Sequence, residues 1–357
     1  MALVRSYAVW NNKGGVGKST ISFHLAARLA EMRPNINVLV IDACPQANAS
    51  MLLLGGGATG EANVLSLCTQ ASPRTIVGYL SQVIAAGAGA ALPDPANFIT
   101  HVSQYSGNLT DNLYLLCGDG NMEPMAPAIS GAAAAPALTP ESQPWRWVHL
   151  VLRHLIDNIC QTVPGRDWLV IIDTNPSFSI YTELAISAAD RLIVPVNADD
   201  SSRVATNAMF ILLHGHTPPH PVYGSWTFAT RAQQHHIVVP QIHVVVGNRL
   251  TQYGGAATAF SALSDATADT LFAAYQNHPQ YFTPRTPPPA TLAAFRDSYS
   301  VPLRDFNTAG VVAAHLGQRL SKMAGGYYQV HGEQVQINSA RVSECINALD
   351  ALVAMVN

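Results

Sequence analysis

The sequence is poor in charge and poorest in lysine. Charged residues make up 11% of the 357, the formal net charge is −3, and lysine occurs only at positions 13, 18 and 322. Without a basic excess, the composition does not mark the chain as a nucleic-acid-binding protein. Since arginine carries most of the positive charge, a lysine is expected where a compact point charge is needed.

Paired cysteines and long apolar runs are missing too. The five cysteines lie far apart without a C-x-x-C spacing, which argues against a zinc or iron–sulfur site and favours a reducing compartment. No apolar run approaches the ~18 residues of a membrane span, and the first residues lack a secretion-signal pattern. Because 48% of the residues are apolar, the chain can build a large core, and we expect a cytoplasmic protein.

Two of the three lysines lie in one glycine-rich segment, residues 11–20, N-N-K-G-G-V-G-K-S-T. The apolar residues 7–10 before it predict a buried strand, and Ile21, Leu25 and Leu29 after it repeat at helical spacing. Glycines on such a strand-to-helix turn let backbone N–H groups converge on an anion. The segment therefore predicts a phosphate-binding loop.

Within this loop, Lys18 would supply the counter-charge for the β- and γ-phosphates, and Ser19 would offer its hydroxyl oxygen to Mg²⁺. The residues expected around the phosphates are Gly14, Gly15, Val16, Gly17, Lys18, Ser19 and Thr20. Asn12 replaces the first glycine of the general pattern, and Lys13 is a second lysine inside the loop. A glycine-rich turn with two solvated lysines is the plainer alternative.

Two buried strands are predicted to end in an aspartate. Residues 36–41 precede Asp42, and residues 168–172 precede Asp173 in a Walker B pattern. A carboxylate at the end of a parallel strand beside the phosphate loop is well placed to hold Mg²⁺ or its water. For Asp173, an acid that caps the following helix is the alternative.

The remaining segments alternate between strand and helix periods. Strands are expected at 113–117, 192–196, 241–247 and 301–303, and helices at 75–80, 147–159, 310–323 and 340–356. This alternation predicts an α/β fold with one doubly wound, mostly parallel sheet and helices on both faces, as a single domain over residues 1–357. The Ala- and Pro-rich residues 122–144 are expected to form a mobile loop.

In order and spelling, these motifs closely resemble the ParA family of partition ATPases, relatives of MinD. The family's deviant phosphate loop K-G-G-x-G-K-[ST] matches residues 13–19, its D-x-D-P-Q-[GA]-N matches Asp42 and residues 45–48, and its D-T-P-P-S resembles residues 173–177. The resemblance runs from about residue 6 to about 325. It implies a deviant P-loop fold, ATP and Mg²⁺ as cofactors, and ATP hydrolysis in plasmid or chromosome partition.

The resemblance also implies roles for particular residues. Lys13 would reach across an ATP-sandwich homodimer to the partner's phosphates, and Asn248, with Arg249 beside it, would meet the adenine edge; the alternative for Asn248 is a turn cap. The implied catalytic residues are Lys13, Lys18, Asp42 and Asp173, and the implied metal residues are Ser19, Asp42 and Asp173. The implied partners are nonspecific DNA, which would bring the protein to the nucleoid, and a ParB-like centromere-binding or adaptor protein.

One departure from the family concerns hydrolysis. Cys44 stands where the family has a second aspartate, which is thought to position the attacking water, so we expect slow basal turnover. The alternative function is therefore a slow nucleotide switch that positions a cargo other than DNA. A small-molecule ligase or synthase is disfavoured, because such enzymes usually lack the early lysine that Lys13 provides here.

Three further features bear on partners. Residues 281–357 carry six cations and five acids, a net of 6 − 5 = +1, which is thin for DNA binding. The final helix carries no lysine, so we expect it to pack on the domain and not to enter a membrane. Six histidines between residues 214 and 243 could hold a metal but are more simply solvated loop residues. Asp199, Asp200 and Arg203 could form the rim of a site but are more simply a helix N-terminus with acids in its first turn.

Overall fold

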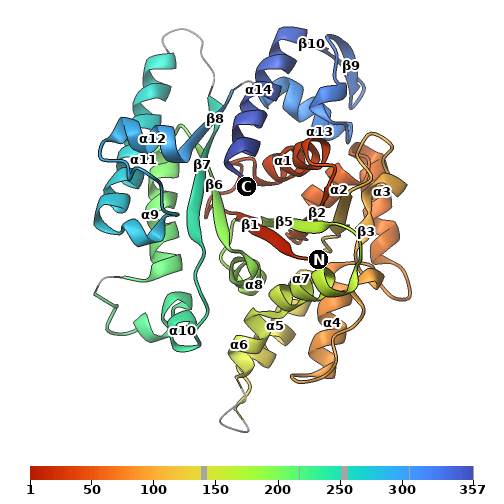
Figure 1. Ribbon diagram of the computed structural model, residues 1–357, viewed down its shortest axis with the longest axis vertical. Helices are drawn as coiled ribbons and strands as arrows, with labels where there is room; N and C mark the ends of the chain where they lie inside the picture. The colour runs from red at the N-terminus through yellow and green to blue at the C-terminus, as the bar shows by residue number, and fades with distance from the viewer. Residues whose placement is uncertain (138–142, 217, 251–255, 305, 357) are drawn as a thin grey trace.

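The structure is a computed structural model that describes residues 1–137, 143–216, 218–250, 256–304 and 306–356 (Figure 1). Its centre is an eight-stranded sheet in the order β3-β4-β2-β5-β1-β6-β7-β8. All neighbouring strands are parallel except β3 and β4. The predicted α/β fold with a doubly wound, mostly parallel sheet is confirmed.

The strands of this sheet are β1 (Leu3–Val9), β2 (Ile36–Ala43), β3 (Thr100–His101), β4 (Leu113–Leu116), β5 (Asp167–Thr174), β6 (Arg191–Asn197), β7 (Gln241–Leu250) and β8 (Ser300–Arg304). A separate antiparallel hairpin consists of β9 (Gly326–Val330) and β10 (Glu333–Ile337). The sequence analysis did not predict this hairpin.

Helices cover both faces of the sheet. Figure 1 shows α1, α13 and α14 above the strands and α5 to α8 below them. The first face carries α1 (Lys18–Met32), α2 (Asn48–Leu53), α3 (Gly57–Cys68), α13 (Val311–His315) and α14 (Ser339–Met355). The second carries α4 (Ile76–Ala86), α5 (Met122–Ala133), α6 (Pro144–His149), α7 (Val151–Thr162), α8 (Ile180–Ala188), α9 (Asp200–His214), α10 (Phe228–Gln234), α11 (Ala256–Asn277) and α12 (Leu292–Tyr299).

Short helical turns complete the described chain. They are η1 (Pro95–Asn97), η2 (Val102–Gln104), η3 (Gly224–Trp226), η4 (Pro279–Tyr281), the π-helical η5 (Phe306–Gly310) and η6 (Leu320–Lys322).

Each central strand feeds two cores, which explains its unbroken apolar sequence. In β5, Trp168 and Val170 enter the core beneath α5 to α8, whereas Leu169 and Ile171 enter the core beneath α1 and α14. Successive side chains of a strand point to opposite faces, so a strand covered on both sides needs apolar residues at every position. The sequence therefore identified these strands by runs and not by alternation.

The predicted mobile loop at 122–144 is wrong over most of its described length. Residues 122–133 form α5, and α6 begins at Pro144; residues 138–142 lie outside the described part. Alanine is the strongest helix former, and Met122 and Ile129 are fully buried, so core packing outweighs the proline signals. Pro124 sits in the first helical turn, where its missing N–H leaves no helical bond unmade.

The helix predicted at 310–323 is also too long. It ends at His315, because Gly317 adopts a left-handed backbone with φ 56° and the Gln318 N–H donates to the Ala313 carbonyl at 2.8 Å. This is the geometry of a glycine-terminated helix. The predicted helix at 147–159 is likewise split, into α6 and α7, at Leu150.

The final helix packs on the domain, as predicted. On α14, Val342, Leu349 and Val353 are buried in the core that α1 shares. The Arg28 guanidinium of α1 donates two hydrogen bonds to the Asp350 carboxylate, at 2.6 and 2.9 Å. Within the described residues, no helix is both long and apolar enough to cross a membrane.

Candidate functional site

The glycine-rich loop lies between β1 and α1, at the carboxyl ends of the central strands, where open α/β sheets bind ligands. Gly15 and Gly17 have φ values of 72° and 83°, in the left-handed region that favours glycine. A pocket of about 500 Å³ opens over the loop, with Cys44, Gln46 and Asn48 on its other wall. Of the loop residues named from the sequence, all but the buried Val16 line this cavity.

Lys18 is buried inside this loop. Its ammonium donates to the carbonyl oxygens of Lys13 at 2.8 Å and Asn11 at 3.3 Å. Burial lowers the pKa of Lys18 to about 8, although the nearby Asp173 carboxylate partly opposes this. The group therefore stays mainly charged at neutral pH and is held by two carbonyls that a phosphate oxygen can replace.

Two fully buried carboxylates face each other across β2 and β5, where Asp42 and Asp173 are register partners. Asp173 accepts hydrogen bonds from the hydroxyls of Ser19 and Ser22, each at 2.7 Å. Burial raises the pKa of both carboxyls, and the charge of Asp173 raises that of Asp42 further. Two buried acids side by side favour a nearby cation.

The donor set fits Mg²⁺, which prefers oxygen ligands. Ser19 and Asp173 would hold the ion or its waters, as the sequence predicts. Asp42 is already engaged, because its carboxylate accepts from the Ser50 N–H at 2.8 Å, the Ser50 hydroxyl at 2.7 Å and the Cys44 N–H at 3.1 Å. Its direct role in this structure is to fix the start of α2, which the sequence analysis missed.

Lys13 is not solvated. Its ammonium forms an ion pair with the Asp199 carboxylate and donates to the Ser202 hydroxyl at 3.2 Å. Asp199 also caps α9, since it accepts from the Ser202 N–H at 2.8 Å; this confirms the predicted helix N-terminus. Burial alone would raise the pKa of Asp199, but the hydrogen bonds from Lys13 and Ser202 outweigh it and lower the pKa to about 2.

Asn248 ties the far side of the loop to β7. Its amide nitrogen donates to the Val16 carbonyl at 2.9 Å. A Cβ at position 17 would lie 2.2 Å from that nitrogen, so only glycine fits there. An adenine contact by Asn248 stays a prediction, and the side chain of Arg249 lies outside the described residues.

Cys44 presents a neutral thiol to the phosphate pocket. It is 4% exposed, and burial, with the Asp42 charge adding to it, raises its pKa to about 12. A protonated thiol is a weak hydrogen-bond acceptor. Position 44 therefore offers no anionic group to an attacking water.

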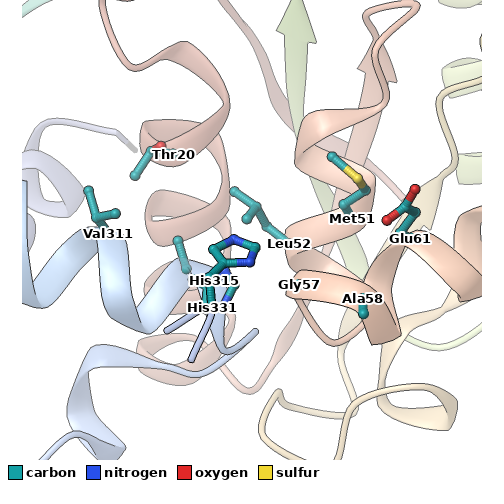
Figure 2. A pocket seen from close by; sticks show the side chains of 10 residues that line it. Thr20, Met51, Leu52, Gly57, Ala58, Glu61, Val311, His315 and His331 are labelled. Carbon is teal, nitrogen blue, oxygen red and sulfur yellow. The ribbon is translucent and has the colours of Figure 1, made fainter. Parts of the chain in front are cut away.

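A second, larger pocket of about 780 Å³ adjoins the first (Figure 2). The two share Thr20, Met51 and Leu52, so the cavity continues from the phosphate loop toward the β9–β10 hairpin. Figure 2 shows His315 of α13 beside His331 of the hairpin turn, and their ring centroids are 4.6 Å apart. This histidine pair could not be predicted from the sequence, because α13 and the turn are brought together only by the fold.

The histidine-dense stretch is structural in part. His214 stacks on Tyr281 with ring centroids 3.5 Å apart, and buried His243 meets the Thr283 hydroxyl at 3.0 Å. These two are therefore not solvated loop residues. In the described portion of the chain, no group of three or more His, Cys, Asp or Glu side chains is placed to hold a metal ion.

Fold and site together define a P-loop nucleotide-binding protein with a two-lysine loop. An AAA domain family model matches residues 4–86. The chromosome-partitioning ATPase Soj of Thermus thermophilus is 29% identical over 198 residues, which is 56% of this chain and 57% of Soj. The match thus spans little more than half of that relative's length.

Solved structures share the fold over nearly the whole chain. Apo McdA from Cyanothece matches with a TM-score of 0.57 and 16% identity, covering 97% of this chain and 99% of McdA. A plasmid partition protein from Borrelia burgdorferi, bound to AMPPNP, matches with a TM-score of 0.51 and 15% identity, covering 99% of each chain. The chain is thus similar in sequence to one chromosome-partitioning ATPase over 56% of its length, and it shares the fold of McdA and the plasmid partition protein over nearly all of it.

Proposed function

We propose that this chain is a ParA-like positioning ATPase that binds Mg·ATP, dimerises around it and acts in plasmid or chromosome partition, through nonspecific DNA and a ParB-like or other adaptor protein. The observation that carries the proposal is the hydrogen bond of 2.7 Å between Ser19 and Asp173, beside buried Lys18 at the phosphate loop. A hydroxyl, a carboxylate and a cation lie together there, and these are the groups that a metal-bound triphosphate needs, which supports the proposal.

Catalysis in this proposal is electrostatic. The loop N–H groups and Lys18 bind the phosphate oxygens. Ser19 and Asp173 would hold Mg²⁺, which would supply positive charge beside the phosphates. The reaction is ATP + water → ADP + phosphate. Basal turnover is slow, because the neutral Cys44 thiol does not orient the water.

Dimer formation follows from the second lysine. In the single chain, Asp199 neutralises Lys13. When ATP brings two chains face to face, Lys13 of each leaves Asp199 and neutralises the other's phosphates. The acid and the partner's nucleotide therefore compete for one ammonium, so the ion pair opposes dimerisation without ATP.

Sedimentation with a slowly hydrolysed ATP analogue tests the dimer. The parent should dimerise, Lys13→Ala should stay monomeric, and Lys322→Ala is the matched control because Lys322 lies outside the site. Asp199→Asn should dimerise several-fold more readily than the parent, since asparagine keeps the helix cap but frees the ammonium. Equal dimerisation of parent and Lys13→Ala would refute the role across the interface.

The alternative is a slow switch for a cargo other than DNA. It is favoured by the ion pairs that several cations in residues 281–357 form. Among those of the six cations in residues 281–357 whose side chains the structure describes, three are ion-paired: Arg296 with Asp265, Arg319 with Glu31 and Arg341 with Glu344. Paired arginines add little to a field that attracts DNA phosphates.

Anisotropy of a fluorescent DNA duplex separates the two candidates. A partition ATPase should bind two unrelated duplexes equally, only with the ATP analogue, and more weakly as salt rises, because counterions are released. The analogue-bound dimer serves as the test species, so the failure of dimerisation is not mistaken for a failure to bind DNA. Absent or salt-insensitive binding by that dimer would favour the cargo switch.

A further inference from the structure

A pocket of about 580 Å³ lies away from the nucleotide site, at the end of the sheet where β6 begins. Among its lining residues are Arg5 of β1, Arg146 and Arg153 of α6 and α7, and Ser187 of α8. From Arg5 to the start of the phosphate loop at Asn11 is six residues, about 20 Å of extended chain. The pocket is therefore separate from the phosphate loop.

The arginines that line this pocket differ in their hydrogen-bond and ion-pair partners. Arg153 is neutralised, because it donates to Asp157 at 3.2 Å and to Asp190 at 2.8 Å. Arg146 donates only to neutral groups, the carbonyls of residues 235 and 236, each at 2.7 Å. Arg5 has no ion-pair partner among the described residues, and its Nε is buried without a hydrogen-bond acceptor. Arg5 and Arg146 thus have no ion-pair partner among the described residues, and with Asp157 and Asp190 also in the lining the charged side chains of this pocket sum to 3 − 2 = +1.

A second donor lacks a partner in the same pocket. Ser187 is 7% exposed, and its hydroxyl oxygen is buried without a hydrogen bond. A buried polar group left unpaired typically costs about 1–3 kcal/mol, and a ligand that reached both of these atoms would recover part of that cost. Guanidinium and hydroxyl donors together suit an acceptor with several oxygens.

The surrounding field has the sign that such an acceptor needs. His243, on β7, is kept neutral: burial lowers its pKa to about 4, and the charges of Arg191, Arg285 and Arg5 lower it further. These arginines therefore act together at this end of the sheet. Arginine forks bind phosphate oxygens in pairs, which a lysine cannot do.

We propose that this pocket binds a phosphate-type oxyanion, with Arg5 and Ser187 donating to its oxygens and Arg146 supplying a further positive charge. The site is independent of the nucleotide at the phosphate loop. The ligand is the phosphate of either a small soluble molecule or a nucleic-acid backbone.

Calorimetric titration with inorganic phosphate at constant ionic strength tests the site. Lys18→Ala is the background, so that the phosphate loop does not contribute. Saturable binding is expected, about tenfold weaker after Arg5→Met and several-fold weaker after Ser187→Ala, and unchanged after Arg166→Met, an arginine outside the pocket. Ser187→Ala keeps the test decisive if Arg5→Met folds poorly.

The proposal would be overturned by the absence of saturable binding. It would also be overturned if the Arg5→Met and Ser187→Ala forms bound phosphate as tightly as the Lys18→Ala background. A second arm distinguishes the two sources of phosphate. If duplex DNA displaces the bound phosphate, the site takes a nucleic-acid backbone; if DNA leaves it in place, the site takes a small phosphate-bearing molecule.

Discussion

At the residue scale, position 44 sets the expected rate of turnover. Its thiol lines the phosphate pocket beside Asp42, whose carboxylate is already committed to Ser50 and to the Cys44 N–H. An aspartate at 44 would add the missing acceptor for a water, but it would also add a third carboxylate near Asp42 and Asp173. Such a variant should hydrolyse ATP faster, but it should be less stable when no ligand is bound.

Cys44→Asp should raise steady-state ATPase turnover about tenfold, which is about 1.4 kcal/mol of barrier. It should also lower the melting temperature without ligand, because like charges would be buried together, and Mg·ATP should restore it. Cys44→Asn is the matched control, since it has the same shape without the charge. A parent that is already fast without any partner, with the aspartate variant no faster, would show that Cys44 is not the missing catalytic group.

Sequence could predict the residues that a short motif contains, but not the contacts that the fold supplies. The phosphate loop and Asp173 were found because spacing and strand context specify them. The Lys13–Asp199 ion pair joins positions 186 residues apart, and nothing local to either one indicates the other. Asp42 was recognised as a strand-end acid, yet its engagement with Ser50 depends on how α2 turns back over β2.

At the element scale, the β9–β10 hairpin is held next to α13 by contacts that include two histidines. Burial lowers the pKa of His315, and the charge of His331 lowers it further. The neutral imidazole is thus favoured in the folded state. Above the unfolded pKa of about 6.5 the stability is intact; as pH falls below it, the unfolded chain binds the proton first and stability is lost.

Hydrogen exchange of the amides in residues 326–337 should therefore accelerate between pH 7.5 and pH 5.5, after correction for intrinsic exchange. His331→Gln should reduce this acceleration, because it removes the like charge beside His315. His278→Gln, a histidine elsewhere on the molecule, is the control. Protection of the hairpin that does not depend on pH would contradict this account of the contact.

Elements with strong apolar runs were predictable, and elements that depend on packing were not. The buried strands and α14 follow from their sequences. α5 was misread because alanine and proline suggested a loop, while buried Met122 and Ile129 hold a helix. The end of α13 depends on Gly317. A Cβ at this position would lie 2.5 Å from the carbonyl carbon of Gly55, which belongs to a segment far away in the sequence.

At the scale of the whole molecule, two different pockets lie at the two ends of one sheet. Its carboxyl end carries the phosphate loop, the paired carboxylates and Lys13, and its other end carries the pocket of Arg5 and Ser187. Alternation of strands and helices predicted the sheet, and the glycine-rich motif predicted the first site. The second site escaped prediction, because its residues come from four separate elements without a motif.

The central claim is that the loop at residues 13–20 binds Mg·ATP, and calorimetric titration with a slowly hydrolysed ATP analogue tests it most directly. The parent and Lys322→Ala should bind alike, and Lys18→Ala should bind at least about 100-fold more weakly, a loss of about 2.7 kcal/mol. This variant removes the main side-chain counter-charge of the phosphates. Unchanged affinity in Lys18→Ala, or no binding by the parent, would contradict the account.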